Sequence, residues 1–528
     1  MSGRRLAEFP AIFMLPALFL AAEFTMRAHG LPYWFWDNLD PSYIYLLNGM
    51  HILQGVAPGH VDHPGTPVQV LVALVLWLSG AGSPGVIGNA AFLDAETLLA
   101  RTSTVIFVLD AGAMVVLGWT VWRRMGALAP ALFAQTAPFI TPLALKQGIG
   151  VKPEPLLLFA VLLLAAAMTQ QALRPGRWPL FAMALVVGFG TACKVTFAPL
   201  GLAPLVLLPD WRRRWLYVGL AALSLLFFIA PALGAIGHML RWFEGLTIGS
   251  GIYGAGPPTV IDPHRFPRAF VQLFFGRPLF LTVYVLGAAI VVLGWYQRRG
   301  WGLAASPGER ALAGGLLAQL AQLLLVAKHP SAHYALPAFE LTGPVAAFLW
   351  LAAGEFEAPP RRARLFRLAY GGGLALVVAA QAVATVRQDR ELARDRDGSM
   401  SIVMARDFPR CANIFRDLSS SPAMAWFDNA NYGSQRYIPR IAPLMPKNDY
   451  FSLFWGNHAP IEDWAGPVEP EALMRDYPCV TLRGRDLGAL RTIAKSFGDY
   501  FDGAALCRAG SESVLAAHAP CPAGTEAR

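Results

Sequence analysis

The chain has 528 residues, of which 55% are hydrophobic and only 15% are charged. Roughly a quarter of the residues of a soluble globular protein are charged, so this composition excludes an ordinary soluble enzyme and indicates a membrane protein. The net charge of +9 does not indicate nucleic-acid binding. The arginines stand in short clusters between apolar segments, as they do in the cytoplasmic loops of membrane proteins.

Apolar segments long enough to cross a bilayer recur along the chain before residue 388. A membrane-spanning helix needs about 20 apolar residues, and we therefore predict a polytopic α-helical membrane protein. It has about eleven transmembrane helices, at residues 10–27, 102–122, 128–145, 155–172, 178–193, 196–208, 215–236, 279–296, 309–327, 335–352 and 365–386. No convincing cleavage site for a signal peptide follows the first segment, so we expect it to be kept as a helix.

The arginine clusters set the orientation of these helices. The apolar run 67–78 is short and lacks a basic flank. If it crossed the membrane, several arginine clusters would move to the outside, against the positive-inside rule. We therefore predict that it is an interfacial helix on the outer membrane face. The polar segments 28–101, 146–154, 238–278 and 328–334 then all lie outside.

Two aspartates stand in the first outer loop, in the stretch WFWDNLDPSYIYLLNG. Asp40 precedes Pro41, and an Asp-Pro pair is a strong start for a helix, here a second interfacial one. Asp40 can be a helix cap, a base that deprotonates an acceptor hydroxyl, or both; Asp37 lies close by. In HVDHPGTPVQ, His63 either belongs to a turn or contacts acceptor or phosphate, while Asp62 fits the turn better.

Charged residues also precede or interrupt later spans. Lys152 and Glu154, in LKQGIGVKPEPLLLF, can stabilise a helix start or grip an anionic lipid head group. Lys194, in FGTACKVTFAPLG, interrupts an apolar run. A charge at membrane depth is costly unless it meets water or an anion, so we favour a functional role for Lys194.

A third outer segment, LLLVAKHPSAHYALPAF, combines four basic and aromatic residues: Lys328, His329, His333 and Tyr334. The two histidines have the spacing of metal ligands on a helix, but a proline disturbs the turn between them and no carboxylate lies near in sequence. We therefore favour contacts to phosphate or sugar. Whether the site uses a divalent metal stays open.

The chain changes character near residue 388. Residues 388–528 contain no spanning segment and are richer in Asp, Asn, Pro and Cys. We predict a transmembrane domain at 1–387 and a mixed α/β domain at 388–528. The latter holds Cys411, Cys479, Cys507 and Cys521. An even number of cysteines indicates two disulfides and a periplasmic or extracellular location, and three pairings are possible.

The order of these motifs resembles that of membrane glycosyltransferases with the C-type fold (GT-C), such as protein O-mannosyltransferases and lipid A aminoarabinose transferases. The matching stretches are DPSYIYLLNGMHILQG, HPGTPVQVLVALVLWL, the KPE before a span, GFGTACKVTFAPLGLAPL and KHPSAHYALPA. The resemblance implies transfer of a sugar from a polyprenyl-phosphate carrier to a lipid, protein or glycan acceptor, usually with inversion. The reaction would occur at the outer face of a bacterial-type cytoplasmic membrane.

The resemblance also implies roles for matching residues. Asp40 would be the catalytic base, with Asp37 as its nearby substitute, and Glu154 would belong to the acceptor or donor site. The candidates for contact with the carrier phosphate would be Lys152, Lys194, Lys328 and His329. The alternative functions are a transporter or flippase, or a polymerase, of lipid-linked sugars. A transporter would be expected to show repeat symmetry, which this sequence does not display.

Overall fold

The computed structural model describes residues 8–35, 42–250, 254, 256–299, 305–354, 360–403, 408–416, 422–445, 450–453, 460–509, 512–522 and 526–527. The chain divides into two compact units. The first contains Met1–Phe24, Val61–Val68 and Ser103–Val386; the second contains Thr25–His60, Gln69–Thr102 and Arg387–Arg528. Parts of the predicted first outer loop therefore belong to the same unit as the C-terminal residues. The division into domains 1–387 and 388–528 stays a prediction.

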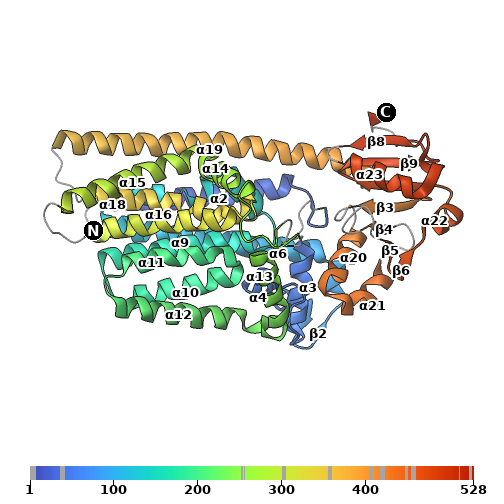
Figure 1. Cartoon of the computed structure of the whole chain (residues 1–528), viewed down its shortest axis with the longest axis horizontal. Coiled ribbons are helices and arrows are strands. Elements are labelled where there is room, and N and C mark those ends of the chain that lie inside the picture. Colours follow the sequence, from blue (N-terminus) through green and yellow to red (C-terminus); the bar gives the residue numbers. More distant parts are fainter. Residues whose placement is uncertain are drawn as a thin grey trace. The chain divides into compact units, whose positions relative to one another are not determined.

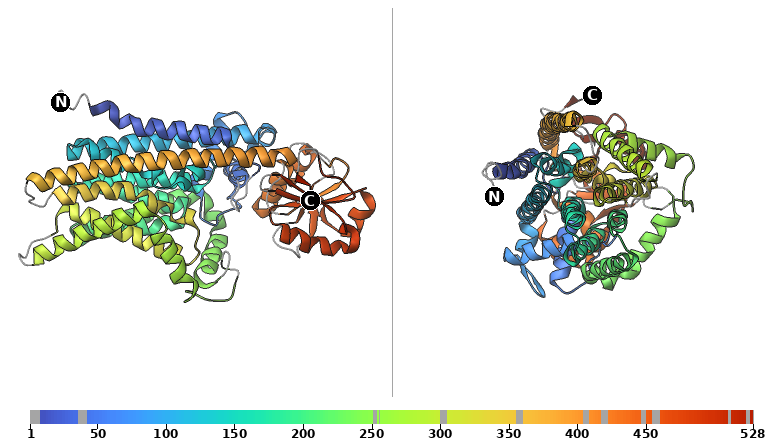
Figure 2. Two further views of the ribbon diagram at one scale, coloured as in Figure 1. Left: turned by 90° about the horizontal axis from the view of Figure 1, so that it is seen from above. Right: turned by 90° about the vertical axis from the view of Figure 1, so that its left-hand side faces the viewer.

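The first unit is helical, and most of its long helices run nearly parallel (Figures 1 and 2). The helices that lie in it or pass through it are η1 (Phe9–Phe13), α2 (Met14–His29), α4 (Thr66–Leu78), α6 (Ala95–Met125), α7 (Leu128–Ala134), η2 (Ala137–Phe139), α8 (Pro142–Gly148), α9 (Pro153–Leu173), α10 (Arg177–Cys193), η3 (Val195–Gly201), α11 (Leu202–Leu207), α12 (Trp211–Ile229), η4 (Ala230–Ala235), α13 (Ile236–Ile248), α14 (Arg265–Phe275), α15 (Pro278–Arg299), α16 (Pro307–Val326), η6 (Ala332–Ala335), α17 (Leu336–Glu340), α18 (Thr342–Gly354) and α19 (Pro360–Val403).

Within the described residues, eight helical segments are long and apolar enough to cross a membrane: Phe9–His29, Ala95–Met125, Pro153–Leu173, Trp211–Ile248, Pro278–Gln297, Pro307–Val326, Ala332–Gly354 and Arg364–Asp397. The prediction of a polytopic α-helical membrane protein is confirmed. Each of these segments coincides with one of the eleven predicted spans. The other three predicted spans, 128–145, 178–193 and 196–208, fall on shorter helices.

Proline explains why the predicted span 128–145 is not one continuous helix. Helix α7 ends at Ala134, and α8 begins only at Pro142. Pro138 and Pro142 have no backbone N–H and cannot continue the hydrogen-bond ladder of a helix. The side chain of Thr141 then caps α8 by accepting a hydrogen bond of 3.3 Å from the backbone N–H of Leu143. Hydropathy alone does not register these breaks.

Small residues allow the helices of the first unit to approach one another closely. Helix α10 packs against both α9 and α12, and α11 packs against α16. A Cβ atom on Gly188 of α10 would collide with Ser224 of α12, and one on Gly314 of α16 would collide with the backbone of Ala203 in α11. Such small residues are typical of helix interfaces within membranes. Helix α9 is buried over most of its length, so it lies in the interior of this unit.

In the described residues, the C-terminal part of the second unit is built on an eight-stranded sheet with the order β10-β8-β9-β7-β3-β4-β5-β6 (Figure 1). The strands are β3 (Ala412–Arg416), β4 (Tyr450–Leu453), β5 (Ile461–Asp463), β6 (Gly466–Val468), β7 (Val480–Gly484), β8 (Ala505–Ala509), β9 (Glu512–Ala517) and β10 (Glu526–Ala527). Strand β3 pairs in parallel with β4 and β7, and the remaining pairs are antiparallel.

Helices accompany this sheet, which confirms the predicted mixed α/β fold. They are α20 (Pro422–Gly433), η7 (Gln435–Tyr437), α21 (Ile438–Ile441), η8 (Ala442–Leu444), α22 (Pro470–Asp476), α23 (Leu487–Ala494) and η9 (Lys495–Phe501). The core between sheet and helices includes Ile414, Leu482, Leu490 and Phe497.

The segments 25–60 and 69–102 of the second unit, which belong to the predicted first outer loop, pack against the C-terminal residues of the same unit. These segments form α3 (Ser42–Leu53), the short hairpin of β1 (Gly82–Ser83) and β2 (Val86–Ile87), and α5 (Ala90–Leu93). Helix α20 lies against α3, where the rings of Tyr43 and Trp426 have centroids 4.8 Å apart. The hydroxyl of Tyr437 donates a hydrogen bond of 2.8 Å to Gln54.

Two disulfides join the cysteines of the C-terminal part, as the cysteine count predicted. Cys411, just before β3, is bonded to Cys479, just before β7, and Cys507 of β8 is bonded to Cys521. The structure thus selects one of the three pairings that the sequence allows. Cys193, at the end of α10, is buried and unbonded.

The two disulfides are expected to differ in their effect on stability. The pairs are separated by 68 and 14 positions in the chain. If loop-closure entropy dominates, the first bond stabilises by roughly 4 kcal/mol and the second by about 3 kcal/mol. We expect Cys411→Ala/Cys479→Ala to shift the urea midpoint for proteolysis of the C-terminal part further than Cys507→Ala/Cys521→Ala does. The reverse order would contradict the entropic account.

Candidate functional site

A backbone junction in the first unit places a lysine beside the turn that precedes α4. Helix α10 ends at Cys193, and Lys194 continues in extended conformation before η3. Here the chain pairs with a distant segment, because Val195 donates its N–H to the carbonyl of His63 (2.9 Å) and Gly65 donates to the carbonyl of Cys193 (3.2 Å). Lys194 and Pro64 form an antiparallel bridge. The HPG turn is thereby fixed next to Lys194.

Lys194 forms a buried ion pair with Glu154. Its Nζ lies 2.6 Å from Oε1 of Glu154, and the two side chains are only 3% and 1% exposed. Glu154 lies in the first turn of α9, so the pair joins the start of α9 to the end of α10. Burying two charges is costly unless they are paired and further polar groups support them.

Such support comes from a third segment, the 3₁₀ helix η6. Nζ of Lys194 lies 4.4 Å from the centre of the Tyr334 ring, a cation–π distance. Nε2 of His333 lies 4.0 Å from Oε1 of Glu154, and Nδ1 of His333 is hydrogen-bonded to Ser331 Oγ at 2.7 Å. Glu154, Lys194, His333 and Tyr334, which come from three separate segments of the sequence, therefore lie together; we call them the charged cluster.

Lys152 lies two residues before Glu154 and is also buried, with 1% of its surface exposed. It is the N-cap of α9, and Pro153 occupies the first helical position, as expected for a helix start. The Lys152 ammonium donates a hydrogen bond to the side-chain oxygen of Gln147 in α8. The KPE motif thus places one buried cation and one buried anion at the same end of α9.

Lys328 and His329 contact a different element. The Lys328 ammonium donates to the carbonyl of Thr247, and Nε2 of His329 lies 2.9 Å from the carbonyl of Leu246. Both acceptors belong to the last turn of α13, where positive charge is favourable because of the helix dipole. These two side chains therefore hold the end of α13, and their proposed role at a carrier phosphate stays a prediction.

Asp62 and His63 are both buried. Oδ1 of Asp62 lies 3.4 Å from Nε2 of His238 in α13. Asp62 was expected to belong to a simple turn, and His238 was not among the predicted site residues. No signal in the sequence indicates this pair, because His238 stands alone in an apolar stretch far along the chain.

The predicted catalytic aspartates, Asp37 and Asp40, lie outside the described residues. The residues on either side of that segment are held by one carboxylate of the second unit. Glu96, at the start of α6, accepts hydrogen bonds from the backbone N–H groups of Tyr33 (2.9 Å) and Trp34 (3.1 Å) and from the hydroxyl of Tyr43 (3.1 Å). We call this arrangement the Glu96 clamp.

The Glu96 clamp has a protonated phenol as one of its donors. Burial, and then the neighbouring Glu96 carboxylate, raise the pKa of Tyr43 well above its ordinary value of 10.0. Tyr43 therefore keeps its proton and donates it to the carboxylate. Glu96 was not among the predicted site residues, because an acidic residue in the first turn of a helix is an ordinary feature.

The described residues contain no group of three or more His, Cys, Asp and Glu side chains arranged to hold a metal ion.

No protein-family model matches the sequence, and neither does any curated protein. A solved structure is similar over almost the whole chain, namely the crystal structure of ArnT from Cupriavidus metallidurans bound to undecaprenyl phosphate. The TM-score is 0.51 and the sequence identity is 13%, with 98% of each chain covered. The chain has the ArnT fold. Since ArnT is a lipid A aminoarabinose transferase with the GT-C fold, the fold predicted from the order of the motifs is confirmed.

Proposed function

We propose that the protein transfers a sugar from a polyprenyl-phosphate carrier to an acceptor, at the outer face of a bacterial-type cytoplasmic membrane. The observation that carries this proposal is the charged cluster, in which Lys194 is held by Glu154 within an ArnT-like fold. The ArnT crystal contains undecaprenyl phosphate, a ligand with an anionic head group on a long apolar chain. A buried lysine in a multi-pass membrane protein suits the phosphate of such a ligand.

The reaction needs a base and a group that stabilises the departing phosphate. The oxygen of an acceptor hydroxyl attacks the anomeric carbon of the sugar while its proton passes to a carboxylate, for which we propose Asp40 or its neighbour Asp37. The bond between the anomeric carbon and the phosphate oxygen breaks, and the carrier phosphate leaves with the electron pair. Lys194, supported by Lys152, stabilises the negative charge that develops there. Attack from the side opposite the phosphate inverts the anomeric centre.

The remaining members of the charged cluster position Lys194. Glu154 and the Tyr334 ring fix the direction of the ammonium group, and Ser331 orients the imidazole of His333. Because these contacts hold the cation in place before the carrier binds, it needs little reorganisation when charge develops on the phosphate. Such preorganisation is the condition for strong electrostatic stabilisation.

Bond cleavage separates this proposal from the alternatives. The purified protein would be incubated with a polyprenyl-phosphate sugar and an envelope extract, and the products would be identified by mass spectrometry. A transferase releases free polyprenyl phosphate and adds one sugar mass to one acceptor. A flippase leaves the sugar–phosphate bond intact, and a polymerase adds repeating units; either result would contradict the proposal.

The Glu96 clamp leads to a prediction for the same assay. Glu96→Gln keeps one acceptor oxygen but removes the charge and adds a donor, so at least one hydrogen bond to Tyr33, Trp34 or Tyr43 is lost. A hydrogen bond to a charged group is worth about 1.5–3 kcal/mol. We therefore expect the rate of transfer to fall by roughly tenfold or more. Glu471→Gln, at an exposed position of α22, is the matched control and should keep the wild-type rate; equal rates for both variants would contradict a positioning role for Glu96.

A further inference from the structure

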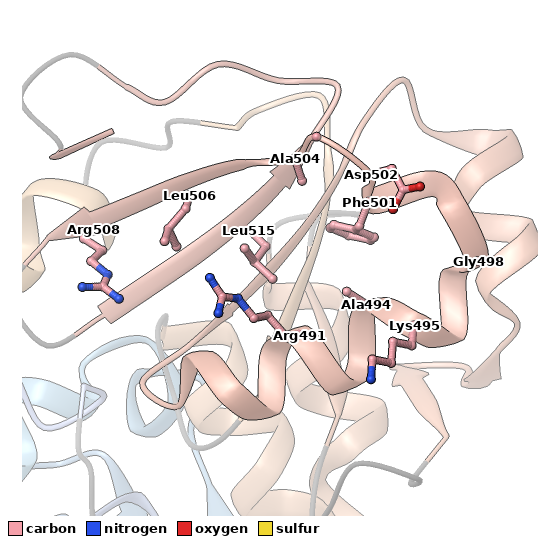
Figure 3. A pocket seen from close by; sticks show the side chains of 11 residues that line it. Arg491, Ala494, Lys495, Gly498, Phe501, Asp502, Ala504, Leu506, Arg508 and Leu515 are labelled. Carbon is pink, nitrogen blue, oxygen red and sulfur yellow. The ribbon is translucent and has the colours of Figure 1, made fainter. Parts of the chain in front are cut away.

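A cavity of about 520 Å³ lies in the C-terminal part of the second unit (Figure 3). It is bordered by α23 and η9 on one side and by β8 and β9 on the other. Its volume falls within the range of roughly 300–1,000 Å³ that is usual for small-molecule sites. None of its lining residues belongs to the charged cluster or the Glu96 clamp.

Positive charge from three different elements gathers around this cavity. Arg491 comes from α23, Lys495 from the start of η9 and Arg508 from β8, while Asp502 is the one acidic side chain among the described lining residues. Figure 3 shows the guanidinium group of Arg491 extending from its helix toward the strand that carries Arg508. Three cations and one anion leave an excess of two positive charges. Bringing like charges together in this way is unfavourable unless an anion binds between them.

One of these cations has an unsatisfied donor. The Nε atom of Arg508 is shielded from solvent and has no hydrogen-bond partner among the described residues. A buried donor without a partner costs roughly 1–3 kcal/mol, so a ligand oxygen that accepts a hydrogen bond from this atom would be favourable. A guanidinium group matches the two oxygens of a carboxylate or phosphate better than any other side chain does.

The rest of the cavity lining consists of apolar side chains and two glycines. Phe501, Leu506 and Leu515 form the apolar part of the wall. Gly498 and Gly503 have φ values of 58° and 73°, and no atom lies within 4 Å of the position that a Cβ would occupy on either glycine. The backbone turns sharply at these two points, and no other part of the described chain covers either glycine. An apolar wall beside a cationic one suits a sugar ring, whose C–H face is apolar, when that ring also carries an acidic group.

We propose that this cavity binds a saccharide bearing a phosphate or carboxylate group, and that this saccharide is part of the acceptor. The anionic group would lie between Arg491 and Arg508, and the sugar ring would lie against Phe501 and Leu506. Assignment of the ligand as acceptor depends on the proposed transferase function, whereas the binding itself does not.

Direct binding to the full-length protein tests this inference. The protein would be held in a polyoxyethylene detergent, which contains neither sugar nor phosphate, and titrated by calorimetry with glucose 6-phosphate, glucuronate and glucose. We expect at least one of the two charged sugars to bind at least tenfold more tightly than glucose. Which of them binds more tightly identifies the acidic group. Binding of both charged sugars no tighter than that of glucose would overturn the proposal.

Variants locate the site. Arg491→Gln/Arg508→Gln should weaken binding of the tighter charged sugar at least tenfold. Lys495→Gln, an exposed substitution at the rim, should weaken it several-fold without unfolding the domain. Arg475→Gln is the control: it lies on α22, is 73% exposed and pairs with Asp476, and its affinity should stay within twofold of wild type. Unchanged affinity in both the double variant and Lys495→Gln would overturn the proposal.

Two further results separate the possible failures. Anionic phospholipid vesicles would serve as a competing probe. If the double variant lost vesicle binding but kept sugar binding, the patch would be a membrane-contact surface and the proposal would be wrong. The titration contains no lipid-linked donor, so tight sugar binding by a protein that cleaves no donor would contradict the proposed function and leave this cavity assignment standing.

Discussion

Replacing Lys194 by methionine is expected to lower the rate of sugar transfer at least about a hundredfold, the usual effect of removing one group that stabilises charge in the transition state. Methionine has nearly the length of lysine but no charge, so the carrier phosphate departs without its cation. The fall should appear mainly in kcat if the contact to phosphate strengthens as the bond breaks. The rate of transfer would be measured as the release of polyprenyl phosphate in detergent, at matched protein levels.

A second variant distinguishes this role from a structural one. Lys194→Met alone leaves Glu154, which is 1% exposed, without its cation, and an uncompensated buried charge is destabilising in itself. The double variant Lys194→Met/Glu154→Gln removes both charges. If Lys194 serves only to neutralise Glu154, the double variant should regain most of the activity. We expect it to stay inactive while its thermal stability recovers; recovered activity would contradict the proposed contact with the carrier phosphate.

Replacing Asp40 by asparagine is expected to lower kcat by roughly 100- to 10,000-fold, the range for loss of a general base. Asparagine caps a helix about as well as aspartate does, so any cap that Asp40 provides should be kept and the donor should still bind. Turnover and donor affinity, measured on the same preparation, check both statements.

The neighbouring aspartate is the control for this prediction. If Asp40 is the base, Asp37→Asn should retain most of the wild-type rate. If instead Asp37→Asn is inactive and Asp40→Asn is active, the base is Asp37. If both single variants keep the wild-type rate, neither carboxylate is the base, and the proposed mechanism is wrong.

Fold class could be predicted because it depends on composition and on the order of motifs. Runs of apolar residues mark the helices wherever hydropathy dominates, as in α9 and α16. The span predicted at 128–145 is not one continuous helix, because Pro138 and Pro142 end helical hydrogen bonding within an apolar run. The disulfide pairing could not be predicted, because it depends on β3 and β7 being neighbours in the sheet, which is a property of the folded chain.

Several residues of the candidate site could be singled out from the sequence, but the contacts between them could not be predicted. Lys194 stood out because a charge within an apolar run is costly, and Glu154 because it opens a span. Their pairing across 40 positions depends on where α10 ends and on the bridge to Pro64. Glu96 and His238 gave no signal, since one resembles an ordinary helix-start acid and the other an isolated histidine. Only the folded chain brings Glu96 to Tyr43 and His238 to Asp62.

The close approach of Gly59 to Gly433 limits which segments of this protein can be exchanged with those of a relative. A side chain on Gly59 would collide with the backbone of Gly433, and one on Gly433 would collide with the backbone of Gly59. Around this point the rings of Tyr45 and Tyr432 both lie against His60. A chimera cut near residue 387, which joins the C-terminal part of one such protein to the helices of another, would place foreign residues against this surface. Exchange of the C-terminal part between relatives would therefore require the segment around Gly59 to be transplanted with it.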